Sequence, residues 1–103
     1  MEAVINEDGL GSAPFIVTPP PGPLAQAAVE RDHRVTSTSN TRPYPLVVNR
    51  AQGCVIEDVD GNRFLDFTAG IAVCSTGHCH PHVLASVRQQ SERLIHICGS
   101  DFY

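Results

Sequence analysis

The chain contains no lysine among its 103 residues. Lysine is the side chain that forms a Schiff base with a carbonyl compound, and its amine is a common acid or base once its pKa has been shifted. A mechanism that needs either role therefore cannot be completed by these residues. This absence limits what the chain can catalyse by itself.

Long apolar runs and clusters of positive charge are also absent. No stretch approaches the roughly 20 apolar residues that a transmembrane helix needs. Seven arginines stand against eleven acidic residues, which gives a net charge of −4. Nucleic acids and anionic membranes bind clustered positive charge, so we expect no nucleic-acid partner and no membrane partner.

The N-terminus and the cysteines give no sign of secretion. The first residues are acidic where a secretory signal would be basic, and no apolar block follows them. The sequence therefore predicts a cytoplasmic protein. The cysteines form no C-x-x-C pair, so we expect reduced thiols rather than a disulfide framework at Cys54, Cys74, Cys79 and Cys98.

The first two-thirds of the chain predicts an arm, a short helix and a sheet. Residues 1–22 have no apolar period and end in prolines, which is typical of a flexible N-terminal arm. An alanine-rich stretch with good helix propensity follows at residues 24–33. Asp60-Gly61 is a typical hairpin turn. We therefore predict a three-stranded antiparallel meander whose strands are residues 46–50, 54–59 and 62–67.

The last part of the chain predicts a long amphipathic helix that begins at Pro81. Six apolar side chains fall within an arc of about 120° at helical spacing, and they are Val83, Leu84, Val87, Leu94, Ile95 and Cys98. The meander and this helix each have one apolar face. We expect the isolated chain to expose apolar surface, because it offers little to cover both faces.

The stretch Gly77–His82, with sequence GHCHPH, has three interpretations. It could be a metal site, a reactive thiol with a neighbouring base, or the start of a helix. A structural zinc site usually takes four ligands in separated pairs, and Pro81 interrupts the alternation that would place the histidines on one face. Nothing in the sequence supplies the oxyanion donors or the third orienting group that a nucleophilic cysteine needs.

The helix start is the interpretation that the residue types favour. Gly77 permits a tight turn, His80 stands at the cap position, and Pro81 can open a helix because its missing N–H is not needed there. We expect the imidazoles to hydrogen-bond to nearby backbone. The alternative of another class is a small metal- or thiol-binding module built on His78, Cys79, His80 and His82.

The order of these pieces resembles a known family. The segment DVDGNRFLDF at residues 58–67 is followed by AGIAV at 69–73, then by G-H-x-H-P-x-V at 77–83, and then by Gln89-Gln90. This set resembles the N-terminal segment of class III pyridoxal-phosphate aminotransferases, and most of all the 4-aminobutyrate aminotransferase type. The stretch TRPYPLV at residues 41–47 fits the same subgroup.

The resemblance implies that the chain is one part of a larger fold. It would be an α+β fragment (short helix, three-stranded antiparallel meander, long amphipathic helix) of an α/β fold-type I enzyme. Residues 23–80 would form the N-terminal part of the small domain, and residues 81–103 a helix leading into the cofactor-binding domain. The chain would be a truncated product or an incomplete sequence, with pyridoxal 5'-phosphate bound by the missing part.

The resemblance also implies an activity and one site residue. The parent enzyme, expected to be a homodimer, would transfer an amino group from an ω-amino acid such as 4-aminobutyrate to a 2-oxo acid. A class III amino-acid racemase is the alternative. Ile71 would be an apolar wall of the substrate pocket, although it could equally be core. His78 and His80 would stabilise a turn, and the resemblance assigns this chain no catalytic, cofactor-binding or metal-binding residue.

Overall fold

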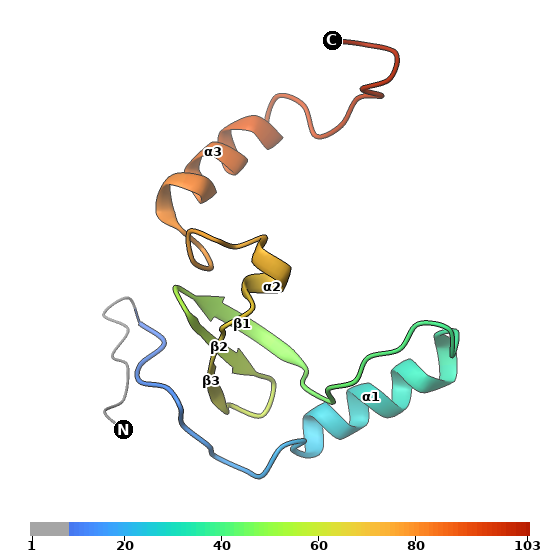
Figure 1. Ribbon diagram of the computed structural model, residues 1–103, viewed down its shortest axis with the longest axis vertical. Helices are drawn as coiled ribbons and strands as arrows, with labels where there is room; N and C mark the ends of the chain where they lie inside the picture. The colour runs from blue at the N-terminus through green and yellow to red at the C-terminus, as the bar shows by residue number, and fades with distance from the viewer. Residues whose placement is uncertain (1–8) are drawn as a thin grey trace.

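The computed structural model describes residues 9–103 as a small sheet with helices on either side of it in the chain (Figure 1). Within these residues no helix has the length and the apolar character that a membrane crossing requires. The elements, in chain order, are α1 (Pro23–Val35), β1 (Val48–Gln52), β2 (Val55–Asp58), β3 (Arg63–Leu65), α2 (Ala69–Ala72) and α3 (Pro81–Ser91).

The predicted three-stranded meander is confirmed. The strands lie in the order β1-β2-β3, and both neighbouring pairs are antiparallel. The turn between β2 and β3 is closed by the amide of Asp58, which donates to the carbonyl of Asn62 at 2.9 Å. Gly61 has a φ of +86° in this turn, a backbone region that glycine enters without a steric cost.

The predicted first helix is also confirmed, and the sheet supplies its N-terminal cap. Gly22 stands at the N-cap position of α1 and has no side chain that could accept a hydrogen bond. The carboxylate of Asp60 takes that role from the β2–β3 turn, because it accepts the amides of Leu24 and Ala25, each at 2.9 Å. A carboxylate also suits the positive end of the helix dipole.

The predicted length of the last helix is wrong. Helix α3 begins at Pro81 as expected but ends at Ser91. The C-terminal half of the predicted apolar stripe lies in non-helical chain beyond it, at Leu94, Ile95 and Cys98.

Local hydrogen bonds end α3 at this point. The carbonyl of Gln90 accepts the amides of both Arg93 and Leu94, at 3.0 and 2.9 Å, so the last turn tightens and the regular ladder stops. The side-chain amide of Gln90 then donates to the carbonyl of Leu94. An amphipathic helix is stabilised mainly by packing of its apolar face. No residue of α3 is buried, so that stabilisation is missing here.

The described part of the N-terminal segment lies along β3. Phe15 and Arg63 exchange two backbone hydrogen bonds of 2.9 and 2.7 Å, and the guanidinium of Arg63 lies 4.4 Å from the centre of the Phe15 ring. The side chain of Asn62 accepts the amides of Val17 and Thr18. Residues 1–8 of the predicted arm lie outside the described residues, and the proposed part boundaries at 22 and 80 stay predictions.

The buried core lies entirely in the first part of the chain. Leu10, Ala13 and Val55 form it, with Leu65 packed against them. No described residue after Asn62 is buried. The radius of gyration is 17.0 Å, whereas a compact domain of this length has about 13 Å. Figure 1 shows the reason, since α1 and α3 extend from the sheet as two separate arms of an open shape.

Candidate functional site

The predicted pocket residue Ile71 lies in a loop, residues 67–77, that connects β3 to the turn before α3. Its central residues form the short element α2, whose backbone is left-handed. The φ angles are +50° at Ala69, +65° at Gly70, +58° at Ile71 and +64° at Ala72. Such a conformation costs about 1–2 kcal/mol per residue with a Cβ atom, and it is rarest for a β-branched side chain. The loop therefore carries backbone strain at its centre.

The carboxylate of Asp66 holds the entry to this loop. One of its oxygens, Oδ1, accepts the amides of Thr68 and Ala69 at 2.8 and 3.0 Å, and also the hydroxyl of Thr68 at 2.9 Å. Inside the loop, the amide of Ala72 donates to the carbonyl of Thr68 at 2.8 Å. These bonds fix the first turn of the loop against the end of β3.

The other carboxylate oxygen of Asp66 reaches the far end of the loop. Its Oδ2 lies 2.6 Å from Nε2 of His78. This hydrogen bond is the largest cause that holds the pKa of Asp66 well below its usual range, and the bond from the Thr68 amide is the second largest. Because the carboxylate is ionised and can only accept, Nε2 of His78 carries the proton and donates it.

The exit of the loop is also bonded to the sheet. The backbone of His78 exchanges two hydrogen bonds of 2.9 Å with Gly53, in the turn between β1 and β2. Gly77 has a φ of +92°, and a Cβ atom there would lie 3.2 Å from the α-carbon of Gly53. A glycine is thus favoured at 77 both by the positive φ and by the close approach of the two backbones.

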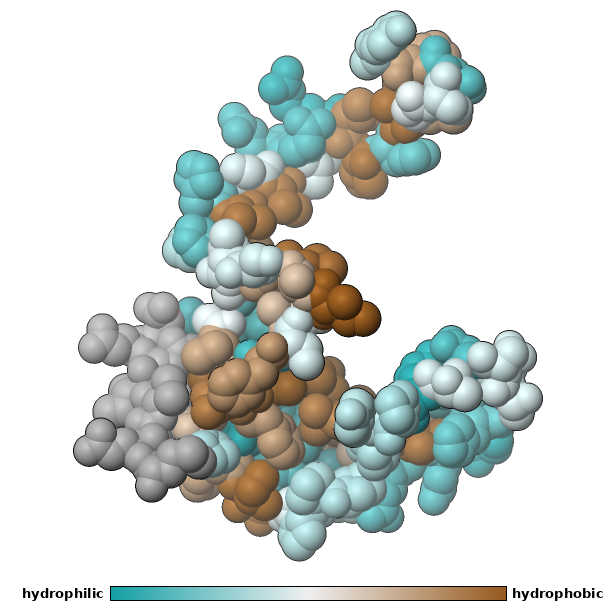
Figure 2. Space-filling view, in the orientation of Figure 1, coloured by the Kyte–Doolittle hydropathy of each residue, from teal (hydrophilic) through white to brown (hydrophobic). Residues whose placement is uncertain are grey.

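The loop presents its apolar side chains to the outside. Ile71 is 93% exposed, and Phe67 and Val73 are 91% and 81% exposed. Figure 2 shows apolar side chains gathered on α2 and along one side of α3, the side that faces the open interior of the molecule. Ile71 is therefore not core of the described chain, and its role in a pocket stays a prediction.

The stretch GHCHPH is the start of a helix, as its residue types favoured. His80 stands at the N-cap of α3 and Pro81 follows at the first helical position. The expectation that the imidazoles bond to backbone is wrong for His78, whose ring bonds to the Asp66 carboxylate. Nothing in the local sequence pattern signals that contact, because the partner lies 12 residues earlier.

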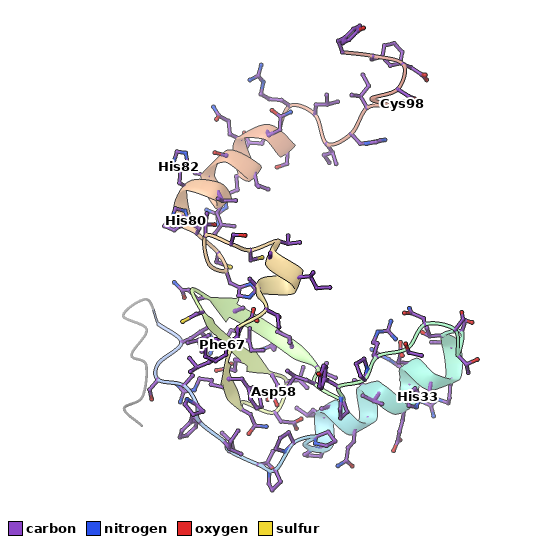
Figure 3. All side chains as sticks on the ribbon, viewed as in Figure 1. His33, Asp58, Phe67, His80, His82 and Cys98 are labelled. Carbon is purple, nitrogen blue, oxygen red and sulfur yellow. The ribbon has the colours of Figure 1, made fainter. Side chains whose placement is uncertain are left out.

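The metal-binding alternative finds no support. Over residues 9–103, no group of three or more histidine, cysteine, aspartate or glutamate side chains is placed to hold a metal ion. Figure 3 shows His80 and His82 at the start of α3 and Cys98 far away in the C-terminal tail. Cys79 is a free and exposed thiol.

A second feature was missed by the sequence analysis, namely the buried polar cluster at the β2–β3 turn. Asp58 and Asn62 are 2% and 0% exposed, and the side-chain amide of Asn62 donates to the Asp58 carboxylate at 2.8 Å. The sequence pattern placed Asp58 and Asn62 only in the predicted strands at residues 54–59 and 62–67 and gave their side chains no role. Their hydrogen bonds stabilise the turn between β2 and β3.

A groove of about 730 Å³ lies between α1 and the segment that leads into β1. An ion pair of 2.7 Å between Asp32 and Arg42 crosses one end of it. Val29, Tyr44 and Leu46 are among its other lining residues. The groove does not include the loop of Ile71, so it and the predicted pocket wall are separate features of the surface.

Comparison with known proteins establishes the family. The sequence profile of the aminotransferase class-III family matches residues 36–102, which include β1 to β3, the candidate loop and α3. The chain therefore belongs to the class III aminotransferases.

Relatives within this family differ in their named activities. An alanine/serine racemase of Pyrococcus horikoshii is 48% identical over 84 residues, which are 81% of this chain and 18% of the racemase. A 4-aminobutyrate aminotransferase of Mycobacterium tuberculosis is 41% identical over 83 residues, again 81% and 18%. An acetylornithine aminotransferase of Archaeoglobus fulgidus is 42% identical over 69 residues, 67% of this chain and 18% of that enzyme.

Solved structures share the arrangement of the elements. The ornithine δ-aminotransferase of Plasmodium falciparum matches with a TM-score of 0.68 and 28% identity, over 77% of this chain and 20% of that one. An ω-transaminase from Sphaerobacter thermophilus matches with a TM-score of 0.62 and 33% identity, over 75% and 19%. The predicted fold class, a fragment of the aminotransferase fold, is confirmed. The chain spans about a fifth of the length of these proteins.

The cofactor that this family generally uses, pyridoxal phosphate, does not fit the residues present here. The chain has no lysine to form a Schiff base with it. The candidate loop offers apolar side chains at its surface and no arginine for a phosphate group, and its one polar pair, Asp66 and His78, is already joined. We therefore derive no chemical step through the cofactor from these residues.

Proposed function

We propose that the protein to which this chain belongs is a pyridoxal-phosphate-dependent transaminase. It would move an amino group from an ω-amino acid such as 4-aminobutyrate to a 2-oxo acid. The observation that carries the proposal is the class III match over residues 36–102. The 4-aminobutyrate aminotransferase relative supports the choice of donor. The cofactor would be bound by polypeptide outside this chain, in a homodimer that we expect to be cytoplasmic.

The part of this chain would be to position the substrate. Ile71 is exposed at the tip of a loop held at both ends, and a fixed apolar side chain of this kind suits contact with the carbon chain of an amino acid. Such a wall excludes water and orients the substrate without taking part in proton transfer. The 103 residues alone are expected to have no transaminase activity, because they contain no lysine.

The test is to express the complete open reading frame that encodes this sequence and to assay the product. We expect 4-aminobutyrate to be consumed together with a 2-oxo acid, with formation of the matching amino acid. Ile71→Ala should raise KM for 4-aminobutyrate about 5- to 10-fold with little change in kcat, since it removes binding shared by ground and transition states. Val35→Ala, at an exposed site at the end of α1, is the control.

An amino-acid racemase is the second candidate, because the racemase of P. horikoshii is 48% identical over 84 residues. The same purified protein decides between the two. Chiral analysis of alanine or serine after incubation reports racemisation, which needs no 2-oxo acid. Conversion of one enantiomer to the other without consumption of a 2-oxo acid would replace the transaminase proposal with this one.

A further inference from the structure

One pair of side chains joins the two ends of the candidate loop. Asp66 precedes the loop and His78 follows it, and their carboxylate and imidazole meet at 2.6 Å. We refer to Asp66 and His78 as the clasp. Their side chains are only 10% and 21% exposed, in contrast to the apolar side chains of the loop itself.

Both clasp residues are also fixed to the same turn of the sheet. The amide of Asp66 donates to the carbonyl of Cys54 at 2.8 Å, and His78 exchanges two backbone bonds with Gly53. The clasp thus joins the loop ends at a place where both are already held by the β1–β2 turn. A closed loop with a rigid base has far fewer accessible orientations than one with a single fixed end.

Packing does not provide an alternative way to hold the loop. None of the described residues of 67–77 is buried. The hydrogen bonds between loop residues, such as that of Cys74 with Ala69, bind the loop to itself and not to the sheet. A left-handed turn such as α2 persists only where surrounding contacts fix it. In the described chain these contacts are the clasp, the bonds from Asp66 to Thr68 and Ala69, and the bonds to the turn at Gly53 and Cys54.

We propose that Asp66 and His78 are positioning residues that set the orientation of the 67–77 loop and thereby aim Ile71 at the amino-acid substrate. Neither residue touches the substrate in this proposal. The second half of it rests on the proposed function, because the pocket role of Ile71 does. The first half concerns the loop alone and can be tested without any activity.

The first experiment measures amide hydrogen exchange by NMR on the 103-residue chain. His78→Ala and Asp66→Asn should each speed exchange at residues 68–77 by about tenfold or more, while exchange at β2 stays unchanged. His82→Ala, at an exposed histidine of the same motif, is the matched control and should change neither. Equal exchange in all variants would overturn the proposal. So would a loop that is unprotected in the unchanged chain, or a loss of protection over the whole sheet.

The second experiment measures kinetics on the product of the complete open reading frame. His78→Ala should raise KM for the amino donor about tenfold and leave kcat within about twofold, and His78→Gln, which keeps an N–H donor, should recover part of the loss. A faster-exchanging loop with an unchanged KM would overturn the positioning role. If the unchanged protein neither transaminates nor racemises, the proposed function fails, and the exchange result still decides whether the clasp holds the loop.

Discussion

The two parts of the chain differ in how far they bury their own side chains. Residues 9–65 contain every buried residue of the described chain, and their buried polar side chains are paired with one another or with backbone. Residues 66–103 contain none, and they expose large apolar side chains such as Ile71 and Ile95. The first part therefore has a small core of its own, whereas the second part has none among the described residues.

The difference places the uncovered apolar side chains of the loop and the tail in the second part of the chain. Apolar side chains gathered on an exposed surface are typical of an interface. The chain spans about a fifth of the length of its relatives, so most of their fold is available to cover such a surface. The exposed side of α3 and the loop of Ile71 face the same open interior (Figure 2). The predictions below test whether the two parts respond as differently as their burial indicates.

The largest effect is expected in the first part, at Asn62. Its fully buried side chain accepts the amides of Val17 and Thr18 and donates to Asp58. Asn62→Ala would leave these buried groups without partners, at a cost of about 3 kcal/mol in the free energy of unfolding. Urea denaturation followed by circular dichroism measures the change.

The matched control for this prediction is Asn40→Ala. Asn40 is exposed in the connector after α1, so the substitution should change the free energy of unfolding by less than about 0.5 kcal/mol. A similar loss in both variants would mean that the first part has no cooperative core. In that case the two parts would not differ in having a core.

The second prediction concerns Ile71, in the second part, where a substitution should raise the stability of the chain instead of lowering it. Since Ile71 is 93% exposed and has a φ of +58°, its side chain contributes strain and little burial. Ile71→Gly should therefore stabilise the chain by about 1 kcal/mol. Glycine removes the steric cost of the left-handed backbone, and the larger backbone entropy that glycine loses on folding offsets only part of this gain. Thermal unfolding measures this gain.

Ile71→Ala is the control that separates the backbone strain from the loss of the larger side chain. Alanine keeps the Cβ atom that clashes in the left-handed region, so it should give little of the gain. In the complete protein we expect both variants to bind the amino donor less tightly. A glycine variant that lowered the stability of the chain would show that Ile71 is packed after all.

The third prediction concerns acid, and it follows from the lowered pKa of Asp66. The folded state binds a proton at this carboxylate less readily than the unfolded state, whose aspartates have a pKa of about 3.9. The contribution of Asp66 to stability is therefore complete above about pH 4 and is lost as the pH falls below it. Asp66→Asn should be less stable near neutral pH but should lose less stability between about pH 4 and 2.

Unfolding curves measured at a series of pH values test this difference. Asp101→Asn, in the exposed C-terminal tail, should keep the acid-dependent decline of the unchanged chain. If Asp66→Asn declined as steeply as the unchanged chain, the hydrogen bond from His78 would not be formed in solution.

The sequence predicted what depends on neighbours in the chain. The meander follows from alternation and from the Asp60-Gly61 turn, and the start of α3 follows from His80 and Pro81. These are local signals, and each is read within a few residues. The candidate loop was located by another route, because Ile71 was named only through the resemblance to the family.

The features that were missed depend on residues far apart. The side chain of Asn62 accepts the amide of Val17, which lies 45 positions earlier in the chain, and the local sequence around neither residue indicates this contact. The length of α3 was overestimated because an apolar period predicts a helix only where a surface covers the stripe, and here no α3 residue is buried. His78 was assigned to a turn, but its carboxylate partner could be found only once the loop was closed.

The smallest effect on folding is expected from the exposed apolar residues of the tail. Ile95 is 88% exposed beyond the end of α3, so Ile95→Ser should change the free energy of unfolding by less than about 0.5 kcal/mol. It should nevertheless reduce self-association of the isolated chain, which sedimentation velocity measures, because the same apolar surface drives association. Thr38→Ser, in an exposed and polar part of α1's connector, is the control and should alter neither quantity. If Ile95→Ser destabilised the chain as strongly as Asn62→Ala, the tail would be packed in solution, and the second part would not be an uncovered apolar surface.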